Sequence, residues 1–438
     1  MNTPIFDFVS AYAKSDAKRL HMPGHKGISL LGCERLDITE IDGADSLYEA
    51  NGIIKESESN ASLLFGCNTF YSTEGASQCI RAMLYLAMLD AKSKGKKPKI
   101  LATRNVHKVF LSALALLDLD AEWIYGKCSY LSCETSAADV ENAIIQFSPT
   151  ALYITSPDYL GNIMDIRAIA DVCKKHDVLL LCDSAHGAYL KFLETSLHPI
   201  DLGADICCSS AHKTLPVLTG GAYLHVKDSE LAENAKNALA IFGSTSPSYL
   251  ILQSLDLANK YLDGEYRNEL DKAVAKVAKL KNELIKNGYT LIGSEPLKIT
   301  ISAKAYGYSG TEFSDILKQK NIICEFADPD FTVLMITPQN QDLQSLKDAL
   351  LNIQKRTEVL KTPPAFQKCE RVMSVRDASL CASETVPVSK SLGRVLAVAT
   401  VGCPPAVPIV MCGERIDENA VECFKYYGIE KCSVVKEL

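Results

Sequence analysis

The central part of the chain alternates short apolar runs with longer segments of helical periodicity. Six short runs predict strands, because each is apolar and has the length of a buried strand. These runs are 99–103, 122–125, 151–155, 178–182, 204–208 and 221–226. Helix-length segments separate most of them, including one from about residue 78 to residue 92. The alternation predicts an α/β fold with a mainly parallel sheet covered by helices on both faces.

Polar residues follow two of these predicted strands. Asp183 comes directly after the run 178–182, and Lys213 lies shortly after the run 204–208. The carboxyl ends of parallel strands meet at one edge of a sheet, which is where open α/β folds bind ligands. A carboxylate and a lysine at that edge suit pyridoxal 5'-phosphate (PLP). The lysine can hold the aldehyde as a Schiff base, and the carboxylate can keep the pyridine nitrogen protonated.

A small-residue turn leads into the predicted helix 78–92. Gly75, Ala76 and Ser77 end this turn, and free backbone N–H groups at a helix start make an anion site. Taken alone, an ordinary N-cap by Ser77 or Thr73 accounts for the same residues.

The second half of the chain predicts two smaller domains. Residues 256–290 predict a long, charged amphipathic helix, and strands at 297–301 and 333–337 bracket a helix at 311–320. After Thr362 the composition changes to short apolar runs broken by Pro and Gly. We therefore expect an N-terminal segment (1–60), a large PLP-binding domain (61–262), a small α/β domain (263–362) and a C-terminal domain (363–438).

Composition narrows the class of protein. The net charge of −7 over 438 residues disfavours nucleic acid as a partner, and no apolar run of 18 residues predicts a membrane span. Many of the 16 cysteines lie in apolar segments and none forms a C-x-x-C pair, which favours reduced thiols in a cytoplasmic protein. No metal site is expected, because His and Cys never take paired ligand spacing.

Several motifs, in order along nearly the whole chain, resemble the bacterial Orn/Lys/Arg decarboxylase family. They are residues 21–27, 37–40, 74–77, 104–108, 183–188, 210–216, 245–249 and 413–416. The resemblance implies a PLP enzyme with an aspartate-aminotransferase-like, mainly parallel seven-stranded sheet, a small α/β domain and a C-terminal domain. It also implies the short branch of the family, without the N-terminal wing and without wing-mediated decamers.

The resemblance implies a role for each cofactor residue. Lys213 would bind the PLP aldehyde, Asp183 would pair with the pyridine nitrogen, His107 would stack on the ring and His186 would lie near its oxygen side. The phosphate would be held by further residues, which are Gly75, Ala76, Ser77, Ser210 and, from the other subunit of a homodimer with shared active sites, Ser244 and Thr245.

The implied reaction is decarboxylation of a basic amino acid. Arginine is slightly favoured over lysine and ornithine, with agmatine, cadaverine or putrescine as the product of polyamine metabolism. Lys213 or His212 would return a proton to Cα after carbon dioxide leaves. Glu414 is the first choice to bind the distal cation, and weaker candidates are Asp45, Asp158, Glu325 and Asp328.

Two alternatives remain at this point. An aminotransferase or aldolase would use the same Lys213 and Asp183, and a regulatory relative would bind PLP without turnover. The chain also departs from the family at Cys403–Ala406, where a Tyr-Pro-Pro-Gly-like turn is usual, and this departure bears on substrate specificity.

Overall fold

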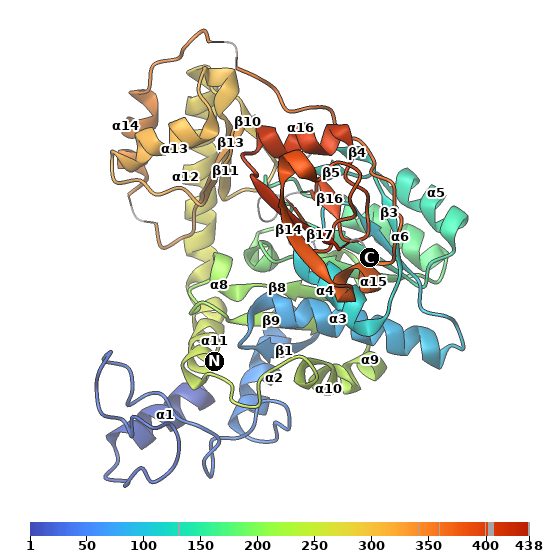
Figure 1. Cartoon of the computed structure of the whole chain (residues 1–438). Coiled ribbons are helices and arrows are strands. Elements are labelled where there is room, and N and C mark those ends of the chain that lie inside the picture. Colours follow the sequence, from blue (N-terminus) through green and yellow to red (C-terminus); the bar gives the residue numbers. More distant parts are fainter. Residues whose placement is uncertain (130–131, 341, 359, 399, 402–406, 437–438) are drawn as a thin grey trace. The chain divides into compact units, whose positions relative to one another are not determined.

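The computed structural model describes Met1 to Lys436 apart from residues 130–131, 341, 359, 399 and 402–406. The chain divides into two compact units, Met1–Pro98 with Cys173–Leu270 and Lys99–Val172 with Asp271–Leu438. Each unit joins segments that are distant in the sequence (Figure 1). The expected four-part division of the sequence stays a prediction. The turn at Cys403–Ala406 lies outside the described residues.

Seven strands form the main sheet, in the order β1-β9-β8-β7-β6-β2-β3. The pairs β7/β8, β2/β6 and β2/β3 are parallel, whereas β9 runs antiparallel to β8 and β1. The prediction of a mainly parallel seven-stranded sheet is confirmed, and β1 is the strand that the apolar pattern did not single out. The strands are β1 Asn68–Ser72, β2 Ile100–Thr103, β3 Ala121–Ile124, β6 Ala151–Thr155, β7 Leu179–Asp183, β8 Ile206–Ser209 and β9 Ala222–Val226.

The first unit surrounds β1, β7, β8 and β9 with helices. Helix α3 packs against β8 and β9 with a buried face that includes Cys79, Met83 and Leu86. It begins three residues earlier than the apolar periodicity indicated, because the small residues of the turn are themselves helical. The helices are α1 Pro4–Lys14, α2 Ile53–Phe65, α3 Gly75–Ser93, α7 Pro199–Leu202, α8 Ala211–Thr214, α9 Ser229–Glu233, α10 Ala235–Ala240 and α11 Tyr249–Asp263, with a 3₁₀ turn at Ala188–Phe192.

The second unit contains β2, β3 and β6, their helices, and a four-stranded antiparallel sheet in the order β10-β11-β13-β12. The predicted strands near 297–301 and 333–337 and the helix between them are confirmed as β11, β13 and α13. The elements are α4 Lys108–Leu117, β4 Lys127–Cys128, β5 Cys133–Glu134, α5 Ala137–Phe147, α6 Ile166–Lys175, β10 Leu291–Ile292, β11 Lys298–Ser302, a 3₁₀ turn at Ala303–Tyr306, α13 Gly310–Lys318, β12 Phe326–Ala327, β13 Phe331–Met335 and α14 Leu343–Leu351.

The C-terminal part of the second unit has a core of its own. Leu396, Ile416, Phe424 and Val434 are buried together there. Strand pairs β14/β17 and β15/β16 frame this core. The elements are α15 Val375–Leu380, β14 Ser383–Pro387, a 3₁₀ turn at Val388–Lys390, β15 Thr400–Val401, β16 Val410–Met411, α16 Glu418–Tyr426 and β17 Lys431–Val435.

One helix prediction was wrong. The segment 256–290 was expected to form one long helix, but it holds the end of α11 and the separate helix α12, Tyr266–Lys286. The break falls at Gly264, whose backbone leaves the helical region (φ −101°, ψ −112°). Glycine destabilises a helix interior because it has the most backbone freedom to lose.

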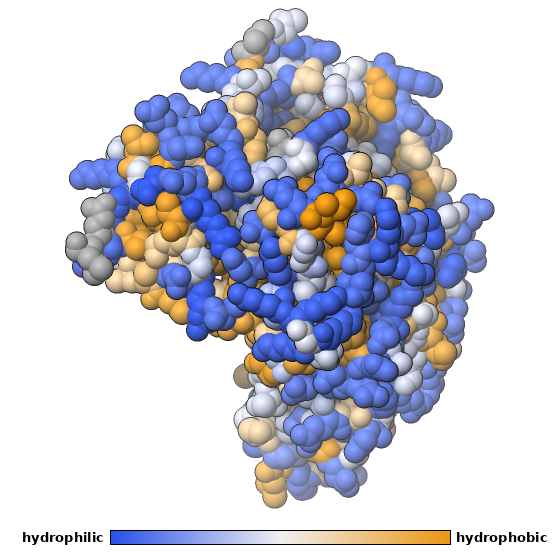
Figure 2. Space-filling model, turned by 90° about the vertical axis from the view of Figure 1, so that its right-hand side faces the viewer, coloured by the Kyte–Doolittle hydropathy of each residue, from blue (hydrophilic) through white to orange (hydrophobic). Residues whose placement is uncertain are grey.

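Polar and charged side chains predominate on the face of the molecule in Figure 2. No helix among the described residues is long and apolar enough to cross a membrane. The same residues contain no group of three or more His, Cys, Asp or Glu side chains arranged to hold a metal ion.

Candidate active site

Asp183 stands at the carboxyl end of β7, opposite Cys208 of the parallel strand β8. Its side chain is almost fully buried, at 3% exposure. Oδ1 accepts hydrogen bonds from the Ala185 backbone N–H at 3.1 Å and from Cys208 Sγ at 3.5 Å. Because one donor is a backbone amide and the other a buried thiol of the neighbouring strand, the carboxylate has a defined orientation at the sheet edge.

Lys213 lies in α8, the short helix that follows β8 directly. Its Nζ is 3.1 Å from Nε2 of His186, a buried residue in the loop after β7. The structure therefore brings the predicted lysine and one predicted histidine into direct contact, with Asp183 on the strand that leads to His186. The two strand ends that the sequence singled out do meet at one edge.

His212 has a different environment from His186. Its Nδ1 lies 3.0 Å from the Gly221 carbonyl oxygen, so Nδ1 carries the proton and donates it to that acceptor. Burial lowers the pKa of His212 below its ordinary value, and the charge of Lys213 lowers it further. In the resulting neutral ring Nε2 is an acceptor, so His212 is suited to receive a hydrogen bond and not to supply a proton.

The start of α3 lies beside α8. The Gly75 N–H donates to the Gly220 carbonyl at 2.7 Å, and a Cβ placed on Gly75 would lie 4.0 Å from His212 Cε1. Gly75 has φ +72°, a left-handed conformation that glycine adopts without strain. Ala76 and Ser77 follow in the first turn of this 19-residue helix, where backbone N–H groups have no helical acceptor. The predicted phosphate turn and Lys213 thus share one unit.

Ser210 and the loop 244–245 also belong to the first unit. Ser210 is buried and precedes α8 as its N-cap residue. Ser244 and Thr245 are exposed, and the Ser244 N–H donates to Glu74, which precedes α3. The loop is therefore held next to the phosphate turn while its side chains face outward.

His107 belongs to the second unit. It is the N-cap residue of α4, and its Nδ1 accepts a hydrogen bond from the Val109 N–H at 3.2 Å. This bond places the proton of the neutral ring on Nε2. The expected stacking of His107 on the cofactor stays a prediction.

Glu414 is buried and paired inside the second unit. Its two oxygens accept from Nη1 and Nη2 of Arg104, both at 2.7 Å, and Oε2 also accepts from the Met411 N–H at 2.8 Å. Arg104 is 0% exposed and Glu414 3%. Although burial lowers the pKa of the guanidinium, the adjacent Glu414 raises it above its ordinary value. The pair satisfies the carboxylate within the chain, which disfavours the predicted role of Glu414 in binding substrate.

The four weaker candidates differ in their surroundings. Asp45 accepts hydrogen bonds from backbone N–H groups at the start of α2, such as that of Gly52 at 2.9 Å, and so stabilises the start of that helix. Glu325 accepts from the Tyr159 hydroxyl at 3.2 Å. Burial raises the pKa of Asp328 to about 6. Asp158 lines a cavity that the sequence did not predict.

That cavity includes residues that the sequence reasoning did not single out. Asn105, Ser132, Glu134 and Thr155 line it together with Asp158. Asn105 and Thr155 end or follow β2 and β6, so the rule that ligands bind beyond the carboxyl ends of strands could have found them.

The residues of the first unit fit PLP. A lysine, a buried carboxylate and the start of a long helix are the three groups that an aldehyde, a pyridine nitrogen and a phosphate require. Two further polar atoms next to them, Ser184 Oγ and Thr214 Oγ1, are buried without a hydrogen-bond partner among the described residues. Buried polar atoms of this kind are uncommon and indicate a missing partner.

Comparison with known proteins identifies the chain. The fold and the residues at the edge of its sheet fit a PLP-dependent enzyme, and the family match below makes it an amino acid decarboxylase. The model of the Orn/Lys/Arg decarboxylase major domain matches residues 3–293, and that of the C-terminal domain matches residues 364–432. The chain belongs to the Orn/Lys/Arg decarboxylase family, as its motifs indicated.

Relatives match along nearly their whole length. An arginine decarboxylase of Halalkalibacterium halodurans is 29% identical over 462 residues, covering 95% of this chain and 91% of that protein. An arginine decarboxylase of Bacillus subtilis is 28% identical, covering 97% and 93%. The crystal structure of a Francisella novicida lysine decarboxylase superposes with a TM-score of 0.82 at 17% identity, covering 99% of this chain and 81% of that chain, and supports the fold.

Proposed function

We propose that this enzyme decarboxylates a basic amino acid, with arginine slightly favoured over lysine and ornithine. The observation that carries the proposal is the contact between Lys213 and His186 beside the buried Asp183, in a chain of the Orn/Lys/Arg decarboxylase family. The preference for arginine is supported by relatives named arginine decarboxylase that are aligned over more than nine-tenths of this chain.

The residues of the first unit have two proposed roles, which are cofactor binding and proton transfer. Lys213 would hold the aldehyde carbon of PLP, Asp183 would keep a proton on the ring nitrogen, and Ser77 with the first N–H groups of α3 would hold the phosphate. Bound PLP supplies an electron sink for the carbanion left by carbon dioxide. Lys213, once the amino group of the substrate has displaced it from that carbon, would return a proton to Cα, because the Nδ1 proton of His212 is already donated to Gly221.

Product identification tests this proposal. The purified chain is incubated with PLP and, separately, with arginine, lysine and ornithine. An amine formed together with carbon dioxide is the expected result. A keto acid would identify an aminotransferase, an aldehyde fragment would identify an aldolase, and bound PLP without any product would identify a regulatory relative.

The proposal includes a homodimer with shared active sites. Ser244 and Thr245 are exposed next to the phosphate turn, as a contact with a second subunit requires. The N-terminal segment also exposes large apolar residues, Leu20 (93%), Leu30 (84%) and Leu31 (89%), which a second subunit would cover in a dimer. Sedimentation velocity of the purified chain should give a dimer, and a fully active monomer would contradict it.

We also place the enzyme in polyamine synthesis in the cytoplasm. The amines that these reactions yield are the polyamines or their direct precursors. Cys79, Cys182, Cys207 and Cys208 are buried, as expected of small apolar core residues in a reducing compartment.

A further inference from the structure

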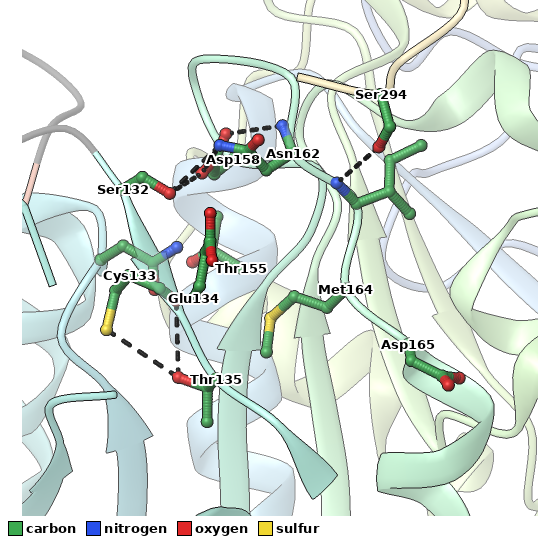
Figure 3. Close-up of a pocket in the computed structure, with 12 residues that line it drawn as sticks. Ser132, Cys133, Glu134, Thr135, Thr155, Asp158, Asn162, Met164, Asp165 and Ser294 are labelled. Carbon is green, nitrogen blue, oxygen red and sulfur yellow. Dashed lines mark hydrogen bonds between the residues drawn. The ribbon is translucent and has the colours of Figure 1, made fainter. Parts of the chain in front are cut away.

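A cavity of about 270 Å³ lies within the second unit, at the carboxyl ends of the neighbouring strands β2 and β6 (Figure 3). Three segments and Ser294 line it. These segments are the loop after β2, residues 132–135 around β5, and residues 155–165 after β6. The cavity is near the lower end of the size range for small-molecule sites, so it suits the end of one amino acid side chain.

The charged side chains that line the cavity are all acidic. Glu134, Asp158 and Asp165 contribute carboxylates, and no lysine, arginine or histidine occurs among the described lining residues. Glu134 and Asp165 are exposed, whereas Asp158 is only 5% exposed. The buried carboxylate is therefore the one that a bound group would meet out of water.

Neutral donors fix the Asp158 carboxylate in place. Oδ1 accepts from the Asn162 N–H at 2.9 Å, and Oδ2 accepts from Asn162 Nδ2 at 2.8 Å and Ser132 Oγ at 2.7 Å. Figure 3 shows these three residues joined along one wall. The nearby Lys298 ammonium pairs with Glu295 at 3.0 Å and reaches only the backbone carbonyl of Asp158. The negative charge thus has no cationic partner among the described residues.

The same cavity contains acceptors that lack donors. Asn105 is 6% exposed, and its Oδ1 has no hydrogen-bond partner among the residues that the structure describes. Thr155 Oγ1 is likewise buried and unpartnered there. Nearly all buried polar atoms in proteins are hydrogen-bonded, so a bound ligand with several N–H donors would satisfy these two acceptors.

We propose that this cavity binds the distal cation of the substrate, a guanidinium or a primary ammonium group. A guanidinium offers five N–H donors in one plane and an ammonium offers three, whereas the lining offers a buried carboxylate, an amide oxygen and a hydroxyl. The assignment rests on the proposed function, because it is the basic amino acid that brings the cation. It gives Asp158, and not Glu414, the leading role in substrate recognition.

Amine binding tests the cavity without requiring turnover. Agmatine, cadaverine and putrescine carry the distal cation but no carboxylate, and calorimetry measures their binding to the full chain. Asp158→Asn should weaken agmatine binding by at least about 10-fold, because one partner of a desolvated charge pair is lost. Asp171→Asn is the matched control, since it makes the same change at an exposed residue of α6, and it should bind agmatine like the wild type.

A second variant covers the case in which Asp158→Asn does not fold, as judged by circular dichroism. Glu134→Gln changes an exposed residue of the lining and should weaken agmatine binding by about 3-fold, as expected for a solvent-screened charge. Unchanged agmatine affinity in a folded Asp158→Asn, or in Glu134→Gln if Asp158→Asn is unfolded, overturns the cation pocket even if the wild type decarboxylates arginine. Weakened affinity together with no carbon dioxide from any of the three amino acids keeps the pocket and overturns the proposed decarboxylase.

Discussion

At the scale of single residues, the roles depend on which side chains already have charged partners. Lys213 Nζ contacts an imidazole nitrogen, and Asp158 is fixed by neutral donors alone. Glu414, by contrast, uses both oxygens to bind Arg104. A motif resemblance marks the segments of Lys213 and Glu414 but not that of Asp158, and it does not separate a carboxylate that binds substrate from one that stabilises the fold.

The Arg104–Glu414 pair gives a test of that distinction. Glu414→Gln should destabilise the chain by about 3 to 5 kcal/mol, because it leaves the buried guanidinium without its counter-charge. The substrate KM should change little. Urea unfolding and steady-state kinetics of the same variant measure the two effects.

A double variant is the control for this test. Arg104→Met with Glu414→Met removes both charges, so much of the lost stability should return. Wild-type stability of Glu414→Gln combined with a raised KM would instead assign Glu414 to the substrate.

At the scale of elements, a buried polar network joins four segments of the first unit. Asp256 of α11 accepts from Ser57 Oγ of α2 at 2.6 Å and from the Phe6 N–H of α1 at 2.9 Å. Asn259 of α11 donates to the hydroxyl of Tyr71 in β1 at 2.6 Å. Burial raises the pKa of Asp256 to about 6. At neutral pH the carboxylate is therefore ionised, and its buried charge destabilises the folded chain.

The Asp256 network predicts a pH dependence. The folded pKa lies above the ordinary value of 3.8, so the folded chain holds the proton more tightly. The tighter proton binding by Asp256 raises the free energy of unfolding. This contribution is complete below about pH 4, is lost as the pH rises through about 6, and amounts to at most about 3 kcal/mol. From pH 5 to pH 8 the urea midpoint of unfolding should fall in the wild type, and it should fall less in Asp256→Asn. Equal falls in both proteins would refute the assignment.

The elements also show what the sequence could and could not predict. Buried strands such as β7 and β8 were predictable because a short, uninterrupted apolar run between polar segments is typical of a strand inside a parallel sheet. The ends of these two strands drew attention to Asp183 and Lys213. The break between α11 and α12 was missed because one Gly264 interrupts an otherwise helical pattern. The sequence offered Asp158 only as one of four weaker candidates and did not predict the cavity around it, since Asn105 and Asp158 come together only through the fold.

At the scale of the whole molecule, the two units have distinct parts in the proposed reaction. The first unit, with Lys213, Asp183 and the start of α3, carries the groups that fit PLP. The second unit carries the acidic cavity around Asp158. Motifs alone predicted the residues proposed to bind the cofactor, because that chemistry requires specific residue types. Substrate choice depends on the volume and charge of a cavity, which no short motif encodes.

Product formation by the wild type and by Lys213→Ala tests the central claim most directly. The wild type with PLP should convert arginine, or else lysine or ornithine, into its amine and an equal amount of carbon dioxide. Lys213→Ala should lower the rate by at least about 1,000-fold, because the covalent and proton-transfer roles are lost together. Lys191→Ala, which removes a partly buried lysine paired with Asp201, is the control and should stay active. No carbon dioxide from any of the three amino acids, or an undiminished rate in Lys213→Ala, would contradict the account.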